Sequence, residues 1–579
     1  MKPQLPLPLL CALFVLPGCA TTQVVDSAEP AEPVAAAGEG EPNMPAVELT
    51  GDMLNDLLLA DIAARRGHLD LSVDLHLGLA KATRDPRLAE RATRLAIFAR
   101  KDEEALKAAE LWIGLEPENL EARQSITAVL IRAGQPEAAL EHIEKVLASS
   151  SSDAADNGFM VVAGLLSREK DKRNALDLMK RFTEKRQDNA EAMFAYAHLA
   201  ARLGEWSVAE EAVNRALALR PQWDQAVVQK AQILHSQGKN AQSLEFMKKT
   251  IAAAPQVAEY RLVYARFLAD GERLQEAYEQ FQALHEIQKE NDDALFALGF
   301  LALELGRLEE AERYLTELRR RGTRGDEVFY YLGRLEEERG NGEAAKRWYN
   351  QVSDGEYYLN AQIRVIVLKS EEKDVAGARA LLDSLRVQRP GQKLRLYLVE
   401  GEILAEANRH QEAYDIYSQA LEEFADNAEL LYARAMSAER LNNLDGMEQD
   451  LRKVLARNPN NAEALNALGY TLADRTNRYE EALELIQQAL ELRPDDVFIL
   501  DSMGWVQYRL GKHENAVKYL RRALELKMDA EIAAHLGEVM WVSGDKNGAR
   551  EIWQRALEAS KGRKEVLRQV MERFEVTTK

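Results

Sequence analysis

Apolar residues recur along this chain at helical spacing, and a small residue marks the same place in each period. From Ala105 to Ala549 that residue returns every 33 to 36 positions and is nearly always alanine. Two apolar stretches with helical spacing fit into each period, which predicts an array of helix–turn–helix units. This first ladder comprises Ala105, Ala139, Ala175, Ala209, Ser243, Ala277, Ala311, Ala345, Ala378, Ala413, Met447, Ala482, Ala516 and Ala549.

A second ladder of small residues lies twelve residues upstream of the first, or thirteen in one repeat. Two small residues per period let two antiparallel helices approach to about 8 Å, the close end of helix packing. Prolines such as Pro255 and Pro494 follow several of the predicted helices, where proline cannot continue them. The second ladder comprises Ala163, Ala197, Ala231, Ala265, Gly299, Gly333, Gly401, Ala435, Gly469, Gly504 and Gly537.

The period and its small residues resemble the tetratricopeptide repeat from about Asp52 onward. The stretch from Asn461 to Pro494 shows the pattern best, with Leu468-Gly469-Tyr470 followed by Ala482. The resemblance implies an all-α fold, a right-handed α-solenoid of about 13 to 15 helix pairs closed by a C-terminal capping helix. The alternative, an irregular helical bundle, would not maintain so regular a period.

Five segments are expected along the chain. They are a lipoprotein signal peptide at 1–18, a lipidated disordered tether at 19–46, divergent helical repeats at 47–117, the repeat array at 118–560, and a capping helix with its tail at 561–579. In the last segment Val566, Val570 and Phe574 recur every fourth residue, with Leu567 and Met571 beside them. A helix lying on a membrane surface is the alternative for that segment.

The start of the chain resembles the lipobox of bacterial lipoproteins. Lys2 precedes an apolar stretch too short to span a bilayer, and the stretch ends in Leu16-Pro17-Gly18-Cys19. The resemblance implies cleavage before Cys19 and its acylation, and Ala20 after it favours the periplasmic face of the outer membrane. An ordinary secretion signal with an incidental cysteine is the alternative.

Charge and cysteine count restrict the partners. The formal net charge is −20, from 75 basic and 95 acidic residues, so nucleic acid and anionic lipid surfaces would be repelled. A protein partner with cationic or mixed charge is expected. Cys11 leaves with the signal peptide, which leaves Cys19 alone and no disulfide. The proline-containing acidic segment at 20–46 predicts a flexible tether.

The sequence contains no motif of a helical metal site, a nucleophile elbow or a phosphate loop. No two of the nine histidines lie three or four residues apart, and no HExxH motif is present. Nucleophile-elbow and phosphate-loop motifs are absent, and nothing alternates as a strand would. We therefore expect no enzyme activity, no metal and no small-molecule cofactor.

Aromatic residues and methionine gather at the repeat positions that line the inner groove in the resembling family. Such side chains dominate protein-binding hot spots. Some of them, Tyr470 and Trp505 above all, could instead pack between helices, because they follow the glycine ladder directly. The predicted partner-binding groove residues are Phe296, Phe300, Tyr330, Tyr432, Met436, Tyr470, Phe498, Trp505, Tyr508 and Trp541.

Lipobox, acidic tether and unbroken repeat array together resemble the periplasmic lipoproteins that serve as adaptors of carboxyl-terminal processing proteases. The resemblance implies a partner serine protease, presentation of cell-wall hydrolases to it as substrates, and attachment to the outer membrane through acyl chains on Cys19. The alternative is a structural lipoprotein subunit of a polysaccharide-export or pilus assembly machine.

Overall fold

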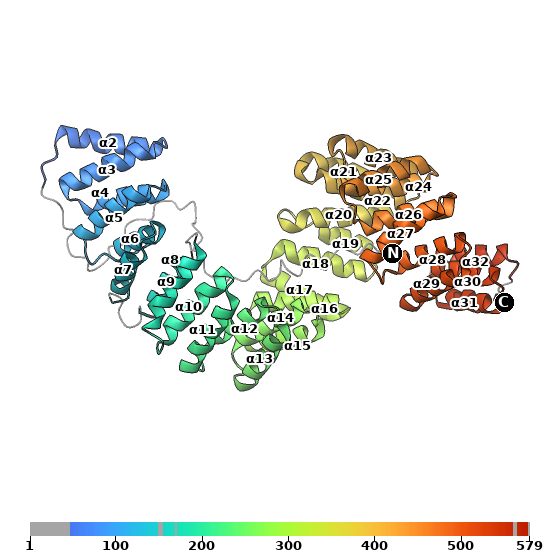
Figure 1. Cartoon of the computed structure of the whole chain (residues 1–579), viewed down its shortest axis with the longest axis horizontal. Coiled ribbons are helices and arrows are strands. Elements are labelled where there is room, and N and C mark those ends of the chain that lie inside the picture. Colours follow the sequence, from blue (N-terminus) through green and yellow to red (C-terminus); the bar gives the residue numbers. More distant parts are fainter. Residues whose placement is uncertain (1–46, 149–154, 168–170, 560–563, 577–579) are drawn as a thin grey trace. The chain divides into compact units, whose positions relative to one another are not determined.

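The computed structural model describes residues 47–148, 155–167, 171–559 and 564–576. In this part of the chain, 31 α-helices and one short 3₁₀ helix follow one another without a strand (Figure 1). The prediction of an all-α helical-repeat fold is therefore confirmed. The predicted signal peptide, the tether and Cys19 lie outside the described residues.

The chain divides into two compact units, with the boundary between Thr323 and Arg324. The first unit contains α2 (Gly51–Arg65), α3 (Leu69–Thr83), α4 (Pro86–Phe98), α5 (Asp102–Leu115), α6 (Leu120–Arg132), α7 (Pro136–Ala148), α8 (Ala155–Leu166), α9 (Lys172–Glu184), α10 (Ala190–Leu203), α11 (Trp206–Leu219), α12 (Asp224–Ser236), α13 (Asn240–Ala253), α14 (Ala258–Asp270), α15 (Leu274–Ile287), α16 (Asp292–Glu304) and α17 (Leu308–Arg321).

The second unit continues the same alternation of helices. It contains α18 (Gly325–Glu338), α19 (Gly342–Tyr349), α20 (Glu356–Glu371), α21 (Val375–Gln388), η1 (Pro390–Gln392), α22 (Lys393–Glu406), α23 (His410–Glu423), α24 (Ala428–Arg440), α25 (Leu444–Arg457), α26 (Ala462–Arg475), α27 (Tyr479–Leu492), α28 (Val497–Arg509), α29 (His513–Leu526), α30 (Ala530–Val542), α31 (Lys546–Ala559) and α32 (Lys564–Arg573).

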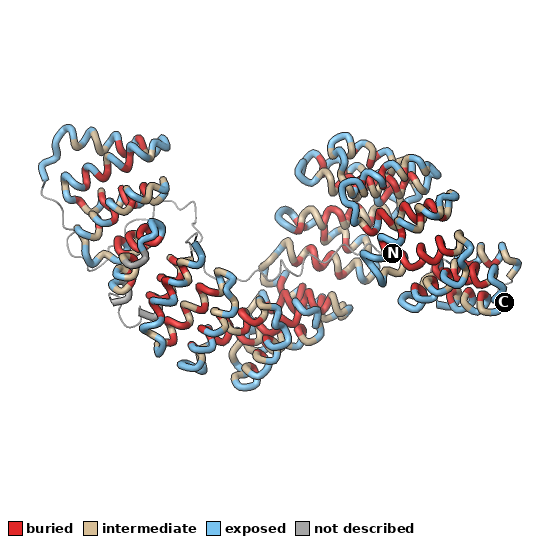
Figure 2. The backbone as a smooth tube through the Cα atoms, viewed as in Figure 1, coloured by how far each residue is buried: buried red, intermediate tan, exposed pale blue. Residues whose placement is uncertain are grey.

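Each even-numbered helix from α2 to α30 packs against the odd-numbered helix that follows it, so the helices form consecutive antiparallel pairs. The first ladder lies on the second helix of each pair, and every one of its fourteen members is at most 1% exposed. Buried residues accordingly recur in the helices of both units, alternating with exposed ones (Figure 2). The small residues predicted to lie at helix contacts therefore do so.

Glycines of the second ladder stand where the facing helix presents a large side chain. A Cβ added to Gly401 would lie 2.1 Å from Cζ of Tyr417, and one added to Gly537 would lie 2.0 Å from Nε1 of Trp553. Both rings come from the second helix of the same pair and are buried. At these two positions the absent side chain is what makes room for the aromatic ring.

Polar caps set the start of many first helices. Asn461 precedes α26, and its side-chain Oδ1 accepts a hydrogen bond from the amide of Ala464 at 2.9 Å. Equivalent asparagines at 119, 189, 291 and 427 cap α6, α10, α16 and α24 in the same way. Each cap satisfies one amide that the first helical turn leaves without a partner.

The first helix pair shares the register of the rest. The hydroxyl of Ser72 in α3 donates to the carbonyl of Ala60 in α2 at 2.8 Å, and that of Ser243 donates to the carbonyl of Ala231 at the same distance. Both bonds link the two small-residue positions of one pair. Ser72 and Ala60 therefore extend the ladders to the start of the described chain.

The last helix covers the end of the second unit. Leu567 and Met571 of α32 are buried against α30 and α31. Val570 and Phe574 are partly buried there, whereas Val566 is 37% exposed. The structure therefore contains the predicted capping helix, with its buried face centred on Leu567 and Met571 and turned away from Val566.

Candidate partner-binding surface

The first helices of the last repeats contact one another directly. Besides packing against their own partners, α28 packs on α26, and α30 packs on α28. Ring centroids of Tyr470 in α26 and His535 in α30 lie 6.2 Å apart, so residues two repeats apart meet. We call the side chains of α26, α28 and α30 around this meeting point the C-terminal inner surface.

Trp505 lies at the centre of the C-terminal inner surface. Its ring stacks on His535 with centroids 4.3 Å apart, and its indole Nε1 donates to Oδ1 of Asp474 at 3.1 Å. Only 8% of Trp505 is exposed. The side chain that the sequence placed in the groove therefore packs mainly against the neighbouring first helices α26 and α30, with little surface left for a partner.

A buried ion pair holds His535 beneath that tryptophan. Its Nδ1 lies 2.9 Å from Oδ1 of Asp501. Burial lowers the pKa of His535, but the Asp501 carboxylate, with Glu531 and Glu538 behind it, outweighs burial and raises the pKa above its ordinary value. His535 was not predicted from the sequence as part of this surface.

Tyr470 lies among carboxylates from several helices. Burial raises its pKa well above the ordinary value, and the charges of Asp474, Asp501, Glu531 and Glu439 raise it further. The acidic groups come from α24, α26, α28 and α30. Two of these carboxylates have cationic partners, Asp501 in His535 and Asp474 in Arg509, so their charge is partly compensated.

Tyr508 and Trp541 connect the inner surface to the capping helix. The hydroxyl of Tyr508 lies 3.5 Å from Oε1 of Glu538, which also pairs with Arg573 of α32. The ring of Trp541 lies 5.7 Å from that of Phe574. Both predicted residues are half-buried. Because Trp541 packs beside Phe574 and Tyr508 lies against Glu538, truncating either of them would disturb packing as well as any partner.

Two cations from the first turns of α31 lie over the ring of Trp541. Lys546 Nζ lies 5.1 Å from its ring centroid, and the guanidinium carbon of Arg550 lies 4.9 Å away. Such cation–π contacts contribute about 0.5–1 kcal/mol at exposed sites. Trp541 is half-buried, so only part of its ring is accessible.

Phe498 is the exposed member of the predicted set. It lies in the first turn of α28, is 48% exposed, and carries Nζ of Lys527 at 4.9 Å above its ring. Tyr432 and Met436 of α24 are half-buried. Burial, with the charge of Glu463, raises the pKa of Tyr432. Phe498 is the predicted residue with the most surface available to a partner.

The three remaining predicted residues lie elsewhere in the chain. Phe296 and Phe300 belong to α16 of the first unit and are buried. Tyr330 belongs to α18 of the second unit, and its ring lies 5.2 Å from Tyr357 and 5.7 Å from Tyr349. The structure therefore joins Tyr470, Trp505 and Tyr508 through direct neighbours, while partner binding by the full set stays a prediction.

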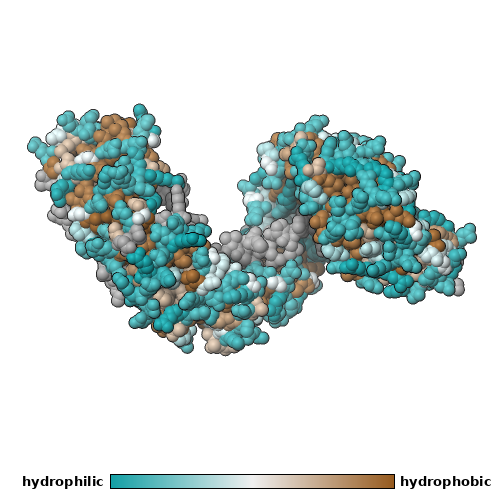
Figure 3. Space-filling model, in the orientation of Figure 1, coloured by the Kyte–Doolittle hydropathy of each residue, from teal (hydrophilic) through white to brown (hydrophobic). Residues whose placement is uncertain are grey.

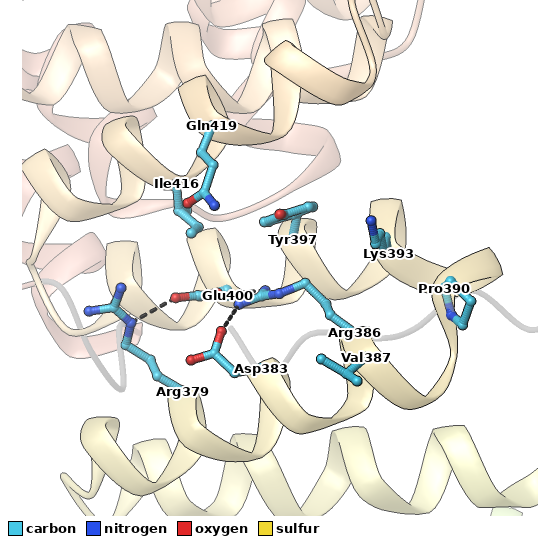
Figure 4. Close-up of a pocket in the computed structure, with 10 residues that line it drawn as sticks. All are labelled: Arg379, Asp383, Arg386, Val387, Pro390, Lys393, Tyr397, Glu400, Ile416 and Gln419. Atoms are coloured by element: carbon cyan, nitrogen blue, oxygen red, sulfur yellow. Dashed lines mark hydrogen bonds and ion pairs between the residues drawn. The ribbon is translucent and has the colours of Figure 1, made fainter.

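A polar cleft that the sequence did not predict lies between α21, α22 and α23. Its volume is about 440 Å³, and Figure 4 shows Glu400 at its floor between two arginines. Nε of Arg379 donates to Oε1 of Glu400 at 2.7 Å, and Arg386 approaches Oε2 at 2.6 Å. The lining residues are Arg379, Asp383, Arg386, Val387, Pro390, Lys393, Tyr397, Glu400, Ile416 and Gln419.

The charges in this cleft compensate one another. Glu400 is 1% exposed, and Arg379 also pairs with Glu412 while Arg386 also pairs with Asp383. A buried carboxylate needs such partners, because an uncompensated buried charge is strongly destabilising. The cluster therefore links α21 to α22 and α23. Both Glu400 and Arg379 adjoin ladder residues in sequence, and that adjacency is the signal that could have found them.

The described residues show neither a metal site nor a membrane-spanning helix. Within them, no three His, Cys, Asp or Glu side chains converge as metal ligands would. No helix in the described ranges combines the length and apolar character needed to cross a bilayer. The chemistry that the structure does present is that of protein surfaces: aromatic rings, carboxylates and ion pairs.

Comparison with known proteins gives consistent matches. Models of the tetratricopeptide repeat match residues 165–222, 268–329, 432–497 and 499–528. The chain is 36% identical over 536 residues to the TPR repeat-containing protein PA4667 of Pseudomonas aeruginosa, covering 92% of this chain and 90% of that protein.

Solved structures also match. The thermophilic TPR protein TTC0263 of Thermus thermophilus is 22% identical, with 32% of this chain and 100% of that chain covered and a TM-score of 0.30. The Cut9–Hcn1 hetero-tetramer of the APC/C is 14% identical, with 83% of this chain and 94% of that chain covered and a TM-score of 0.31.

Proposed function

This chain belongs to the tetratricopeptide-repeat proteins, and from that premise we propose that it is a lipid-anchored periplasmic adaptor. In this proposal it binds a carboxyl-terminal processing serine protease and presents cell-wall hydrolases to it. Repeats of this family indicate a scaffold for protein–protein interaction. The protease, its substrates and the anchor on Cys19 are the finer part that we propose.

The observation that carries the proposal is the C-terminal inner surface. Its aromatic rings are partly accessible and have carboxylates beside them, and the exposed Phe498 lies on one of its helices. Aromatic anchors in a charged surround are typical of protein-binding sites. The described residues offer no comparable arrangement of metal ligands.

An adaptor of this kind acts by raising the local concentration of protease and substrate. A tether of about 27 residues has a root-mean-square reach of roughly 30 Å, so an array anchored at Cys19 would stay near the membrane yet clear of it. Holding protease and substrate on one scaffold turns their meeting into a nearly intramolecular event. This explanation requires no catalytic group on the chain itself.

Affinity capture tests the proposal. The full-length chain, solubilised from envelopes in mild detergent, should retain a serine protease of the carboxyl-terminal processing class, and deleting that protease should stabilise cell-wall hydrolases in the cell. Recovery of a pore or pilus protein without any protease would contradict the adaptor function and favour a structural subunit of an export or assembly machine.

A matched pair of variants tests the surface. Phe498→Ala removes an exposed ring and should weaken partner binding by about tenfold or more, as at a moderate hot spot, with little change in stability. Val387→Ala is the control, because Val387 is 83% exposed and lies at the cleft between α21 and α23. Equal binding by both variants, measured by titration calorimetry, would mean that the partner docks elsewhere.

A further inference from the structure

A second cleft lies in the first unit, between α13, α14 and α15, and we call it the α13–α15 cleft. Its volume is about 390 Å³, and it takes the same place in the repeat as the cleft between α21, α22 and α23. Leu244 and Ile251 line part of it, and charged side chains line the rest. Figure 3 shows hydrophobic and hydrophilic side chains intermixed over the first unit.

The two ladders align the two clefts residue by residue. Lys248 lies five residues after the first ladder, at the repeat position of Asp383 in the other cleft. Tyr264 lies directly before the second ladder, at the repeat position of Glu400. The two carboxylates that compensate the arginines between α21 and α23 are therefore replaced by an ammonium and a hydroxyl in the α13–α15 cleft.

Two cations of the α13–α15 cleft have no carboxylate partner in the described part of the chain. Nε of Arg261 donates to the carbonyl of Pro255 at 3.1 Å, and its Nη1 donates to Oε1 of Gln280 at 3.2 Å. Both acceptors are neutral, so they hold the guanidinium in place without neutralising it. Lys248 is exposed, and its ammonium forms no ion pair within the described ranges.

The two carboxylates of the cleft have cations of their own. Glu276 pairs with Arg273 at 2.7 Å, and Glu245 pairs with Lys249 at 3.3 Å. Three cationic and two acidic residues line the cleft, which leaves one positive charge in a chain whose net charge is −20. This local excess matches the charge of one carboxylate.

Tyr264 supplies a buried hydrogen-bond donor. It lines the cleft and is 7% exposed, and its hydroxyl has no hydrogen-bond partner among the described residues. Burial raises the pKa of Tyr264, so the hydroxyl keeps its proton at neutral pH. Buried polar groups are nearly always hydrogen-bonded in proteins, and a ligand oxygen would provide the partner that this one lacks.

We propose that the α13–α15 cleft binds a peptide segment in which an acidic residue lies beside an apolar one. Lys248 and Arg261 pair with the carboxylate, and Tyr264 donates to it. Hydrogen bonds between a cation and a carboxylate are about twice as strong as those between neutral groups. The site lies in the first unit, apart from the C-terminal inner surface, and does not depend on the proposed protease.

The remaining lining residues favour a peptide over a small acid. Leu244 and Ile251 offer apolar surface to the neighbouring side chain of the segment. Because Oε1 of Gln280 accepts from Arg261, its Nε2 is available to donate to a peptide carbonyl. The cleft volume lies near the lower end of ligand sites, which suits two side chains of an extended segment.

Saturation-transfer NMR on the full-length protein in mild detergent tests the site with N-acetyl-leucyl-glutamate amide. This peptide should receive saturation from the protein, and its glutamine counterpart, which has the same size without the charge, should receive several-fold less. Absence of saturation, or equal saturation of the two peptides, would overturn the proposal. Displacement of the glutamate peptide by an equal concentration of acetate would also overturn it, since any carboxylate would then suffice.

A charge change at one repeat position separates the site from the overall charge of the chain. Lys248→Asp should weaken binding of the glutamate peptide by about tenfold or more, the effect of losing one charged hydrogen bond. Lys180→Asp is the matched control, because Lys180 of α9 is exposed and also lies five residues after a ladder residue, but does not line the cleft. Equal weakening by both variants would show that only net charge matters and would contradict the site.

Tyr264→Phe tests the buried hydroxyl. Because the hydroxyl has no partner in the described structure, its removal should leave urea unfolding unchanged and weaken binding of the glutamate peptide several-fold. Unchanged binding would contradict the proposed contact with the carboxylate. Loss of stability would show that the hydroxyl is already bonded within the fold, and it would count equally against the site.

Discussion

Gly537 offers the sharpest test of how the helix pairs are packed. In Gly537→Ala, the new Cβ would lie 2.0 Å from Nε1 of Trp553, whereas an ordinary contact begins near 3.4 Å. The indole would have to retreat by about 1.4 Å. Trp553 is fully buried, and its ring lies 5.8 Å from Trp541 and 6.0 Å from Phe574, so the movement would be transmitted to the capping helix.

The magnitude follows from two opposing effects. Overpacking a core of this kind costs about 1–3 kcal/mol, and a rigid, enclosed indole places this site at the upper end. Replacing glycine by alanine within a helix contributes about 1 kcal/mol in the other direction. We therefore expect the free energy of unfolding of the last repeats to fall by about 2 kcal/mol.

Amide hydrogen exchange measures this loss locally. Protection in α30, α31 and α32 should decrease in Gly537→Ala, while Gly78→Ala should increase protection in α3, because a Cβ on Gly78 meets nothing within 4 Å. A double variant with Trp553→Leu should be less destabilised than the two single effects added together. If Gly537→Ala proved as stable as Gly78→Ala, the proposed close contact between α30 and α31 would be wrong.

Three further outcomes are expected. Because the pKa of His535 is raised in the folded chain, the stability from its pair with Asp501 should be fully present below the ordinary histidine pKa. That stability should decline as the pH rises through the raised pKa. Urea unfolding at about pH 6 and pH 8.5 should show this decline in the unsubstituted chain and not in Asp501→Asn. Glu400→Gln should lower the free energy of unfolding by about 2 kcal/mol, less than a fully buried pair would, because both arginines keep a second carboxylate; unchanged denaturation would contradict the linking role of that cluster. Cys19→Ser should release the chain into the soluble periplasmic fraction with its circular dichroism spectrum intact, and unchanged membrane fractionation would refute the lipobox prediction.

The repeat fold could be predicted because its packing depends on residue size at fixed intervals. All fourteen residues of the first ladder are buried, including Ser243 and Met447, which depart from alanine. Ser243 keeps the position by donating its hydroxyl to the carbonyl of Ala231. Size and spacing are properties of the local sequence, so a single chain reveals them. The same logic, applied one period earlier, would have placed Ser72 and Ala60 in register.

The partner surface could be predicted only in part, because exposure depends on contacts between repeats. Trp505 occupies a groove position by sequence, yet it packs against His535 from the next first helix. Tyr470 meets that same histidine from the other side. How closely successive first helices approach is set by many small contacts, and no short pattern encodes it. Phe498, near the start of its helix, stays exposed because it lies away from that meeting point.

Some side chains are buried in contacts between helices and others stay exposed, and this difference indicates which positions determine partner specificity. Arg379 follows a residue of the first ladder and Glu400 precedes one of the second, and the two form a contact between helices. Residues farther from the ladders, such as Phe498, and those on the first described helix, such as Leu58, keep much of their surface. Substitutions at buried positions such as Glu400 change the packing of the array itself, so they are poorly suited to altering which partner is bound. Substitutions at exposed positions such as Phe498 should therefore determine partner choice, and they leave the packing between helices unchanged.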